Sequence, residues 1–391
     1  MGCIALFFAS NKPNTMKRLT TATHTTNDSK TIQLFMVTKN SADLLPEFLR
    51  HYRRIGVEAF YIIDNASTDH TRDILQQQPD VSLFLARGNF AKNRCGVRWL
   101  NTLINRYSRN TWCLVVDSDE LFIYPFYETM PLQTFCQYLD QHDYQATYAL
   151  MMDVYDRGKP IAQLTADFTH LYYDPIDTHQ TVNTHFFPYH FLKGGPRNRV
   201  FFPNQPNHPA SPCLSKIPLI KPKRGFQYVN STHNCTPLKL ADLTCVLVHF
   251  KLTEQFHQYT HQQTYQQERV CIELYERYHQ TLSQTQKPIE YFDAQISQPI
   301  EGSTHLMQSG LFGHSSTFDQ FCKQHDLMLP THATAKPATI IRTIHSTATQ
   351  KSPVWEQLKT YAFSQVCNVL YRVLPWKRRL RNWLQQRKTE R

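Results

Sequence analysis

The sequence has 391 residues, enough for one large domain or two, and a formal net charge of +11 at pH 7. Residues 351–391 contain ten Lys or Arg against two Glu, which accounts for +8 of that charge and leaves only +3 for residues 1–350. The near-neutral body and the absence of an RNA- or DNA-binding signature exclude nucleic acid as the expected partner.

The cysteines and the N-terminus suggest a cytoplasmic protein. The ten cysteines form no CxxC pair and no metal-finger spacing, so we expect free thiols in a reducing compartment. The start, MGCIALFFAS, has an apolar stretch without a charged leader, which does not fit a signal peptide. No apolar run approaches the ~20 residues of a membrane span. We expect residues 1–30 to be a flexible segment.

Strands and helices are predicted to alternate from residue 31 onward. Apolar runs of strand length lie at residues 32–38, 59–64, 81–86 and 112–117. Predicted helices separate them at residues 46–56, 69–78 and 93–107. Such alternation indicates right-handed crossovers and a mostly parallel sheet flanked by helices. The fold class is therefore α/β.

The pattern becomes looser beyond residue 132. We predict a helix at 132–141, a strand at 146–155, an irregular region at 156–235, a strand at 246–252 and a long polar helix at 254–280. The expected catalytic domain covers residues 31–290, with a donor half at 31–125 and an acceptor half at 126–290. Residues 291–350 read as a loosely ordered polar segment, and residues 351–391 as a basic helical tail.

Polar side chains follow the end of each predicted strand in the donor half. They are Lys39 and Asn40, then Asp64 and Asn65, then Arg87, Lys92 and Arg94, and finally Asp117 and Asp119. In open α/β sheets ligands bind outside the carboxyl ends of the strands, so these residues should converge. Because no GxGxxG or GxxxxGK[ST] loop is present, a diphosphate would need a metal ion and side-chain cations.

Two segments resemble a known family. KNSADLLPEFLRHYRRIGVEAFYIIDNASTDHT and WCLVVDSDELFIYP resemble bacterial glycosyltransferases of family 2, in the branch with an "LPEWL" opening. The resemblance covers about residues 32–125 and continues more loosely through GGPRNRVF, STH and VLVHFKL to about residue 280. It implies a GT-A fold, a nucleotide-sugar donor, a glycan or lipid-linked acceptor and a Mn²⁺ or Mg²⁺ ion.

The same resemblance implies roles for the residues at the strand ends. Asp64 and Asn65 match the pair that holds the base and ribose. Asn65 departs from the common Asp-Asp: its amide can accept from a uracil N–H and can also donate, so it leaves the base open, with a UDP-sugar as the favoured donor. Asp117 would contact the ribose and the metal, and Asp119 would bind the metal. The remaining residues expected to bind the donor are Asn40, Lys92 and Arg94.

The roles of residues in the second half rest on weaker signals. His249 is either a core histidine or a third metal ligand, and His233 competes for that role or contributes to catalysis at the acceptor. Arg197 and Arg199 lie two apart, so on a strand they would share a face and could clamp an anionic leaving group or acceptor. For the catalytic base of an inverting transfer we predict Asp153. The sugar and acceptor contacts are expected within residues 156–235.

Other functions compete with this interpretation. LVVDSDEL could be the Asp-x-Asp of a phosphohydrolase, although it ends a fourth predicted strand rather than a first. The carboxylates could also simply begin a helix or turn. A basic nucleic-acid binder is disfavoured, because the charge lies mainly in the tail.

The tail has the pattern of a helix that lies on a membrane. Trp376, Leu380, Trp383 and Leu384 share one helical face, and most of the Lys and Arg residues lie away from it. Such a helix suits an anionic membrane surface, and we expect the enzyme to be peripheral on the inner face of the cytoplasmic membrane. The alternative is a helix packed on the catalytic domain.

Overall fold

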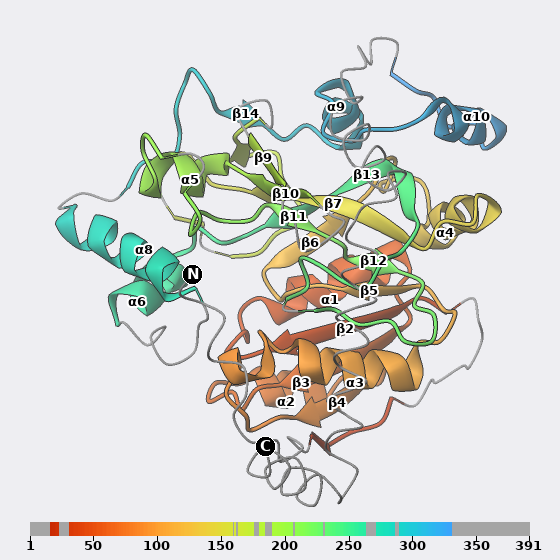
Figure 1. Ribbon diagram of the computed structural model, residues 1–391, viewed down its shortest axis with the longest axis horizontal. Coiled ribbons are helices and arrows are strands. Elements are labelled where there is room, and N and C mark those ends of the chain that lie inside the picture. Colours follow the sequence, from red (N-terminus) through yellow and green to blue (C-terminus); the bar gives the residue numbers. More distant parts are fainter. Residues whose placement is uncertain are drawn as a thin grey trace, which may run out of the picture.

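Figure 1 shows the computed structural model of the chain. It describes residues 16–22, 31–158, 160–161, 163–175, 180–183, 190–205, 208–229, 231–262, 271–285 and 289–330. The predicted basic tail with its membrane contact lies outside the described residues, as does most of the segment 1–30.

The donor half is a parallel sheet covered by helices. Its strands are β2 (Gln33–Thr38), β3 (Ala59–Asp64), β4 (Val81–Leu85) and β5 (Cys113–Val115), in the spatial order β4-β3-β2-β5. The helices are α1 (Leu45–Ile55), α2 (Thr71–Gln76) and α3 (Val97–Tyr107), with the 3₁₀ turn η1 (Ala91–Asn93) before α3. Almost every strand residue is buried, as expected for a parallel sheet covered on both faces. The predicted α/β class is confirmed.

The sheet becomes mixed in the second half. It adds β6 (Glu120–Ile123), β7 (Ala146–Asp153), β11 (Ser215–Lys216), β12 (Leu219–Ile220) and β13 (Leu240–His249), and α4 (Leu132–Gln141) precedes β7. Strand β13 runs parallel to β7 and antiparallel to β6, and β12 lies between β5 and β7. The C-terminal end of β13 therefore meets the start of β6, which places residues far apart in sequence at one edge.

The smaller elements complete the second half. Strand β8 (Tyr172–Tyr173) pairs with β14 (Gln298–Pro299), and β9 (Gln180–Asn183) pairs with β10 (His190–Lys193). At the other edge of the large sheet, β1 (Lys17–Arg18) pairs with β4. These two residues belong to the segment 1–30, which was expected to be flexible, and they form the edge strand of the sheet.

A second, aromatic core supports the helices α5 (Gly195–Phe201), α6 (Glu254–His261) and α8 (Ile272–Gln284). The Tyr278 ring lies at its centre, 4.6 Å from the Phe201 ring and 5.1 Å from the Phe256 ring, both edge-on. Figure 1 shows α6 and α8 together at one side of the molecule. The single long helix predicted at residues 254–280 is therefore wrong, because α6 ends at His261 and α8 begins at Ile272.

The segment after residue 290 is more ordered than its composition suggested. It forms α9 (Ser303–Gln308) and α10 (Ser316–Gln324), and Leu306, Phe312 and Phe318 are buried in the main core. The prediction of a loosely ordered segment is thus wrong for residues 291–330; residues 331–350 lie outside the described part.

The state of the cysteines and the expected lack of a membrane-spanning helix can both be examined in the described residues. Their cysteines are all free thiols, as expected. Within the same part of the chain, no helix is both long and apolar enough to cross a bilayer. The cytoplasmic location itself stays a prediction.

Helix α1 contains a buried histidine whose protonation should weaken the fold. The His51 Nε2 lies 2.9 Å from the Phe122 carbonyl oxygen, and burial lowers the pKa of His51 to about 4. In the unfolded chain His51 has a pKa near 6.5, so the unfolded state binds this proton more tightly. The free energy of unfolding therefore keeps its full contribution from neutral His51 above about pH 6.5 and decreases as the pH drops toward 4. The expected loss at pH 5 is roughly 2 kcal/mol. Urea unfolding at pH 8 and pH 5, with His51→Gln as the non-titrating control, measures it. Equal pH dependence of both proteins would contradict the prediction.

Candidate functional site

The carboxyl ends of the donor-half strands open into a cavity of about 440 Å³, which we call the first cavity. Its wall includes Lys39 after β2, Asn65 after β3, residues 87–90 after β4 and residues 117–119 after β5. His249 and Lys251, at the end of β13, complete it. The structure thus brings together residues from four parallel strands, and β13 supplies a fifth contribution.

Hydroxyl groups hold the loops around this cavity in place. The Ser41 Oγ lies 2.8 Å from the Thr38 Oγ1 and 2.9 Å from the Ser118 Oγ, which joins the loop after β2 to the turn after β5. The backbone N–H of Ser41 donates to the Thr71 Oγ1 at 2.7 Å, and that of Asn40 donates to the Ser67 Oγ at 2.9 Å. These hydrogen bonds fix the loops before any ligand arrives.

The Asn65 amide is oriented by two backbone carbonyls. Its Nδ2 donates to the oxygens of Ala86 and Gly88, both at 2.9 Å. Because both N–H groups are used, the Oδ1 is the atom of this amide left to accept a hydrogen bond. Asn65 can therefore accept from a ligand N–H but cannot donate to it.

Asp64, by contrast, supports the loop from beneath. Its carboxylate is fully buried, accepts from the backbone N–H of Ser67 at 2.9 Å and pairs with the Arg72 Nε at 3.0 Å. It does not line the cavity. The contact of Asp64 with base and ribose stays a prediction, while its bonds to Ser67 and Arg72 hold the loop after β3 in place.

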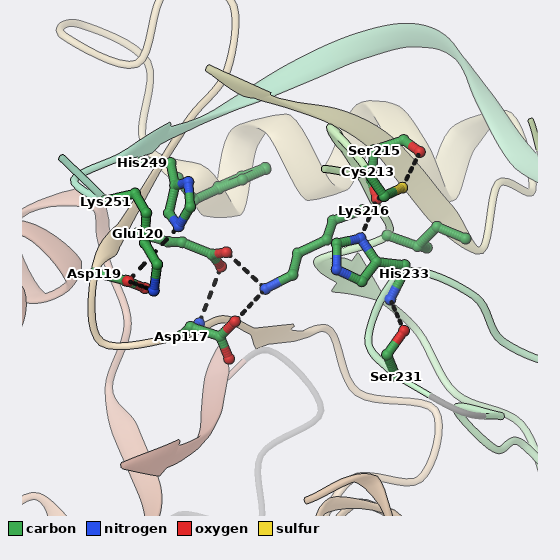
Figure 2. A network of polar contacts seen from close by, with 12 residues as sticks. Asp117, Asp119, Glu120, Cys213, Ser215, Lys216, Ser231, His233, His249 and Lys251 are labelled. Atoms are coloured by element: carbon green, nitrogen blue, oxygen red, sulfur yellow. Dashed lines mark hydrogen bonds and ion pairs between the residues drawn. The ribbon is translucent and has the colours of Figure 1, made fainter. Parts of the chain in front are cut away.

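The DSDE segment forms a turn between β5 and β6, with a buried lysine behind it. The Lys216 Nζ lies 2.6 Å from the Asp117 Oδ2 and 2.6 Å from the Glu120 Oε1 (Figure 2). The other Glu120 oxygen accepts from the backbone N–H of Asp117 at 3.0 Å. Glu120 and Lys216 are buried, whereas about half of the Asp117 side chain is exposed to the cavity. Burial raises the pKa of Glu120, and Lys216 opposes the shift.

Asp119 faces two cationic or potentially cationic groups. Its Oδ2 lies 3.6 Å from the His249 Nε2 and 3.6 Å from the Lys251 Nζ (Figure 2). Burial favours the neutral carboxyl, but Lys251 and His249 outweigh it and hold the pKa of Asp119 well below its usual range. Asp119 is therefore a carboxylate at neutral pH.

His249 is held between Asp119 and a second, deeper carboxylate. Its Nδ1 lies 2.6 Å from the Asp153 Oδ1, and the other Asp153 oxygen accepts from the Arg197 Nε at 2.7 Å. Burial lowers the pKa of His249, yet Asp119 and Asp153 together raise it above its ordinary value. Histidines that bind a metal through one ring nitrogen commonly donate the other ring N–H to a carboxylate. In His249, Nδ1 faces Asp153 in this way, and Nε2 faces Asp119.

The donor groups at this position fit a divalent cation. One ligand atom each from Asp119, Glu120 and His249 lies within 4.8 Å of the others. Asp119 and His249 border the cavity, whereas Glu120 is already bonded to Lys216 and to Asp117. A mixed oxygen and imidazole set suits Mn²⁺ better than Mg²⁺. The structure thus retains Asp119 and His249 as candidate ligands, with Asp117 bonded to Lys216 beside them.

Several sequence predictions in the second half need correction. Asp153 is buried with both oxygens bonded, and Arg197 and His249 lower its pKa against the effect of burial, so it is unsuited to act as a base. Arg197 and Arg199 lie on helix α5 and not on a strand. They therefore point to different partners, since Arg199 pairs with Asp174 at 3.0 Å. Neither arginine lines the first cavity.

The remaining predicted residues lie outside the first cavity. His233 places its Nδ1 2.6 Å from the Ser215 carbonyl oxygen, on the far side of Lys216 (Figure 2). Lys92 is exposed on η1, and Arg94 borders a different surface hollow beside α3. Asn40 is next to the cavity, but its Oδ1 accepts from the backbone N–H of Thr68 at 2.8 Å. Lys92 and Arg94 were expected to contact the diphosphate. Neither lines the first cavity, although residues 87–90 of the same segment do.

Three basic residues are more prominent than the sequence suggested. Lys251 and Arg87 line the cavity, and Lys216 lies behind its carboxylates. Arg87 lies two residues after β4, and the sequence pattern already placed it among the polar residues at the strand ends. Lys216 lies in a two-residue strand within the irregular region, where no periodicity points to a buried ion pair.

Comparisons with known proteins do not identify the family. No known family matches the sequence, and no curated protein does. Among solved structures, a 4-diphosphocytidyl-2C-methyl-D-erythritol synthase is 12% identical, with 35% of this chain and 64% of that chain covered and a TM-score of 0.21. A UDP-glucose pyrophosphorylase complexed with UDP-glucose is 8% identical (76% and 98% covered, TM-score 0.20), and one from Acinetobacter baumanii is 11% identical (80% and 99% covered, TM-score 0.20). Similarities this low support no inference about the function of this protein.

Proposed function

We propose that this protein is a metal-dependent glycosyltransferase that transfers a sugar from a nucleotide-sugar donor, most favourably a UDP-sugar, to a glycan or lipid-linked acceptor with inversion. One observation carries the proposal: a single cavity at the carboxyl edge of the sheet combines an oriented amide acceptor, several cations and a carboxylate beside an imidazole. Those are the groups that a base, a diphosphate and a divalent cation respectively require.

The base would be recognised by Asn65. Since its amide can only accept, it suits the N3–H of uracil, which donates. Cations follow at the phosphate end, where Lys39, Arg87 and Lys251 line the same cavity. No glycine-rich loop is available to hold the phosphates, so these side chains take that role.

The metal would be held by Asp119 and His249, beside Asp117. When bound, Mn²⁺ or Mg²⁺ would offset the negative charge that develops on the departing nucleoside diphosphate. The protein's own contribution is to keep the donor groups in place: Asp153 orients His249, and Lys216 fixes Asp117. Lys251 would supply a second positive charge near the oxygens of the departing diphosphate.

A ligand screen tests this proposal. Melting temperatures of the purified full-length protein are measured with UDP-, GDP-, CMP- and dTDP-sugars, each with and without Mn²⁺. We expect stabilisation by UDP-sugars that requires Mn²⁺, because a ligand that binds only the folded state raises the melting temperature. Hydrolysis of p-nitrophenyl phosphate without any response to nucleotide sugars would instead support the phosphohydrolase interpretation and contradict the proposal.

Replacing Asn65 should weaken UDP binding in particular. Asn65→Leu removes the acceptor for the base and leaves the Ala86 and Gly88 carbonyls without their donor, so we expect a loss of roughly 10- to 100-fold in UDP affinity. The matched control is Asn101→Leu, because the Asn101 side chain also makes two hydrogen bonds to backbone atoms, those of Tyr228. Unchanged UDP affinity in Asn65→Leu, measured by calorimetry, would exclude this residue from base recognition.

A further inference from the structure

A second cavity, of about 690 Å³, adjoins the first. The two cavities share Lys39, Ser118, Asp119 and Lys251. A molecule in the second cavity would therefore reach the same Asp119–Lys251 pair as a nucleotide in the first cavity. Its volume lies within the usual range for small-molecule sites, about 300–1,000 Å³.

Helix α6 forms one wall of the second cavity. Gln255, Gln258, Tyr259 and Gln262 follow the spacing i, i+3, i+4, i+7 and all line it, so they share one helical face. Phe256, which also borders the cavity, packs edge-on against Tyr278 in the aromatic core. This packing fixes the direction in which the glutamines and Tyr259 point.

The loop after β2 forms the opposite wall, and the two walls are connected. The Gln255 Nε2 donates to the Asp43 Oδ2 at 2.7 Å, which joins α6 to this loop. At the start of α6 the Thr253 Oγ1 caps the helix by accepting from the backbone N–H of Phe256 at 3.2 Å. The cavity thus lies between two walls that the Gln255–Asp43 hydrogen bond links, one held by the aromatic core and the other by the hydroxyl network of Ser41.

The lining suits a neutral, hydroxyl-rich ligand. Amides and hydroxyls dominate it, and Tyr259 and Phe250 add aromatic surface. Asp43 accepts from the Gln255 amide through one oxygen, and Asp69 accepts from the backbone N–H groups of Ala42 and Thr71 through both, so each carboxylate already has a donor within the protein. An acyl chain would leave the amides unsatisfied. Of the remaining charged residues, Lys251 lies beside Asp119, and Lys39 is shared with the first cavity. A saccharide offers both hydroxyls for the amides and C–H faces for the rings.

We propose that the second cavity binds the saccharide part of the acceptor, with α6 as its recognition helix. This inference rests on the proposed function and deepens it, since it names the acceptor end as an uncharged sugar. It also moves the acceptor contacts from residues 156–235, where the sequence suggested them, to residues 253–262.

Saturation-transfer NMR tests the proposal with simple probes. Full-length protein is mixed with the methyl glycosides of glucose, galactose, mannose and N-acetylglucosamine, each with and without UDP and Mn²⁺. We expect at least one glycoside to receive saturation, and we expect its affinity to fall about fivefold in Tyr259→Ala, in line with the loss of one aromatic contact. Gln258→Ala should also weaken it, whereas UDP affinity stays unchanged in both variants.

The control is Gln137→Ala, which changes an exposed glutamine on α4 that lines neither cavity. No saturation of any glycoside by the wild type, or equal affinity in Gln258→Ala, Tyr259→Ala and Gln137→Ala, would overturn the acceptor assignment. A failure of the proposed function gives a different result, namely that UDP does not bind the wild-type protein in any of the mixtures. The arm without UDP still decides whether the second cavity binds sugars.

Discussion

Asp119→Asn is expected to reduce sugar transfer by roughly 1000-fold or more while the protein remains folded. The change keeps the size of the side chain but removes the negative charge that faces His249 and Lys251, and with it a candidate ligand of the cation. Loss of electrostatic stabilisation at the leaving group typically costs factors of 100 to 1000, and loss of the metal adds to this. Turnover of the UDP-sugar selected by the ligand screen, with saturating Mn²⁺, measures the effect.

A matched variant separates this effect from a general loss of acidic charge. Asp73→Asn removes an exposed carboxylate on α2 that lines neither cavity, so its activity should equal that of the wild type. Circular dichroism and the melting temperature check that Asp119→Asn is folded. Near-normal turnover by Asp119→Asn would refute the assignment of this carboxylate to the metal site.

Lys216→Met is expected to lower the free energy of unfolding by about 3–5 kcal/mol. The lysine ammonium compensates the buried Glu120 carboxylate and also holds Asp117. Without it, Glu120 would be charged and unpaired in the interior, or would have to take up a proton. Urea unfolding followed by fluorescence provides the free energy.

The double variant Lys216→Met/Glu120→Gln distinguishes an ion pair from simple packing. Removing both charges should restore most of the stability, because a buried pair replaced as a whole costs far less than one broken in half. A double variant no more stable than Lys216→Met would show that the lysine acts by its bulk, and a single variant as stable as the wild type would contradict the pairing itself.

The donor half of the fold could be predicted because its signals are local. Apolar runs of strand length identified β2 to β5, and Pro46 with Gly56 marked the two ends of α1. Polar residues that directly follow such strands must meet at one edge of a parallel sheet. For this reason Lys39, Asn65, Asp117 and Asp119 could be placed together from sequence alone.

The second half depends on contacts between distant segments, which the sequence does not display. His249 meets Asp119 because β13 pairs with β6 in a register that sets His249 opposite Glu120. Lys216 reaches its carboxylates from a strand of two residues. Arg197 lies in a region expected to be irregular, although Pro196 in the first turn is a local signal that favours a helix start.

Hydrophobic burial also overrode composition in two regions. Residues 303–324 look polar and irregular, yet Leu306, Phe318 and Phe321 supply enough apolar surface to fix α9 and α10 on the main core. Likewise, the polar appearance of α6 conceals Phe256, which anchors it in the aromatic core. A few large apolar side chains outweigh many polar neighbours when they are placed on one face.

The most direct test of the central claim is calorimetric titration of UDP into the wild-type protein and into Asp119→Asn, with and without Mn²⁺. We expect Mn²⁺ to tighten UDP binding by at least ~10-fold, about 1.4 kcal/mol, in the wild type and to have little effect in the variant. Absence of UDP binding at about 1 mM in the presence of Mn²⁺, a concentration at the upper end of ordinary substrate affinities, would contradict it. So would an identical response of the two proteins to the metal.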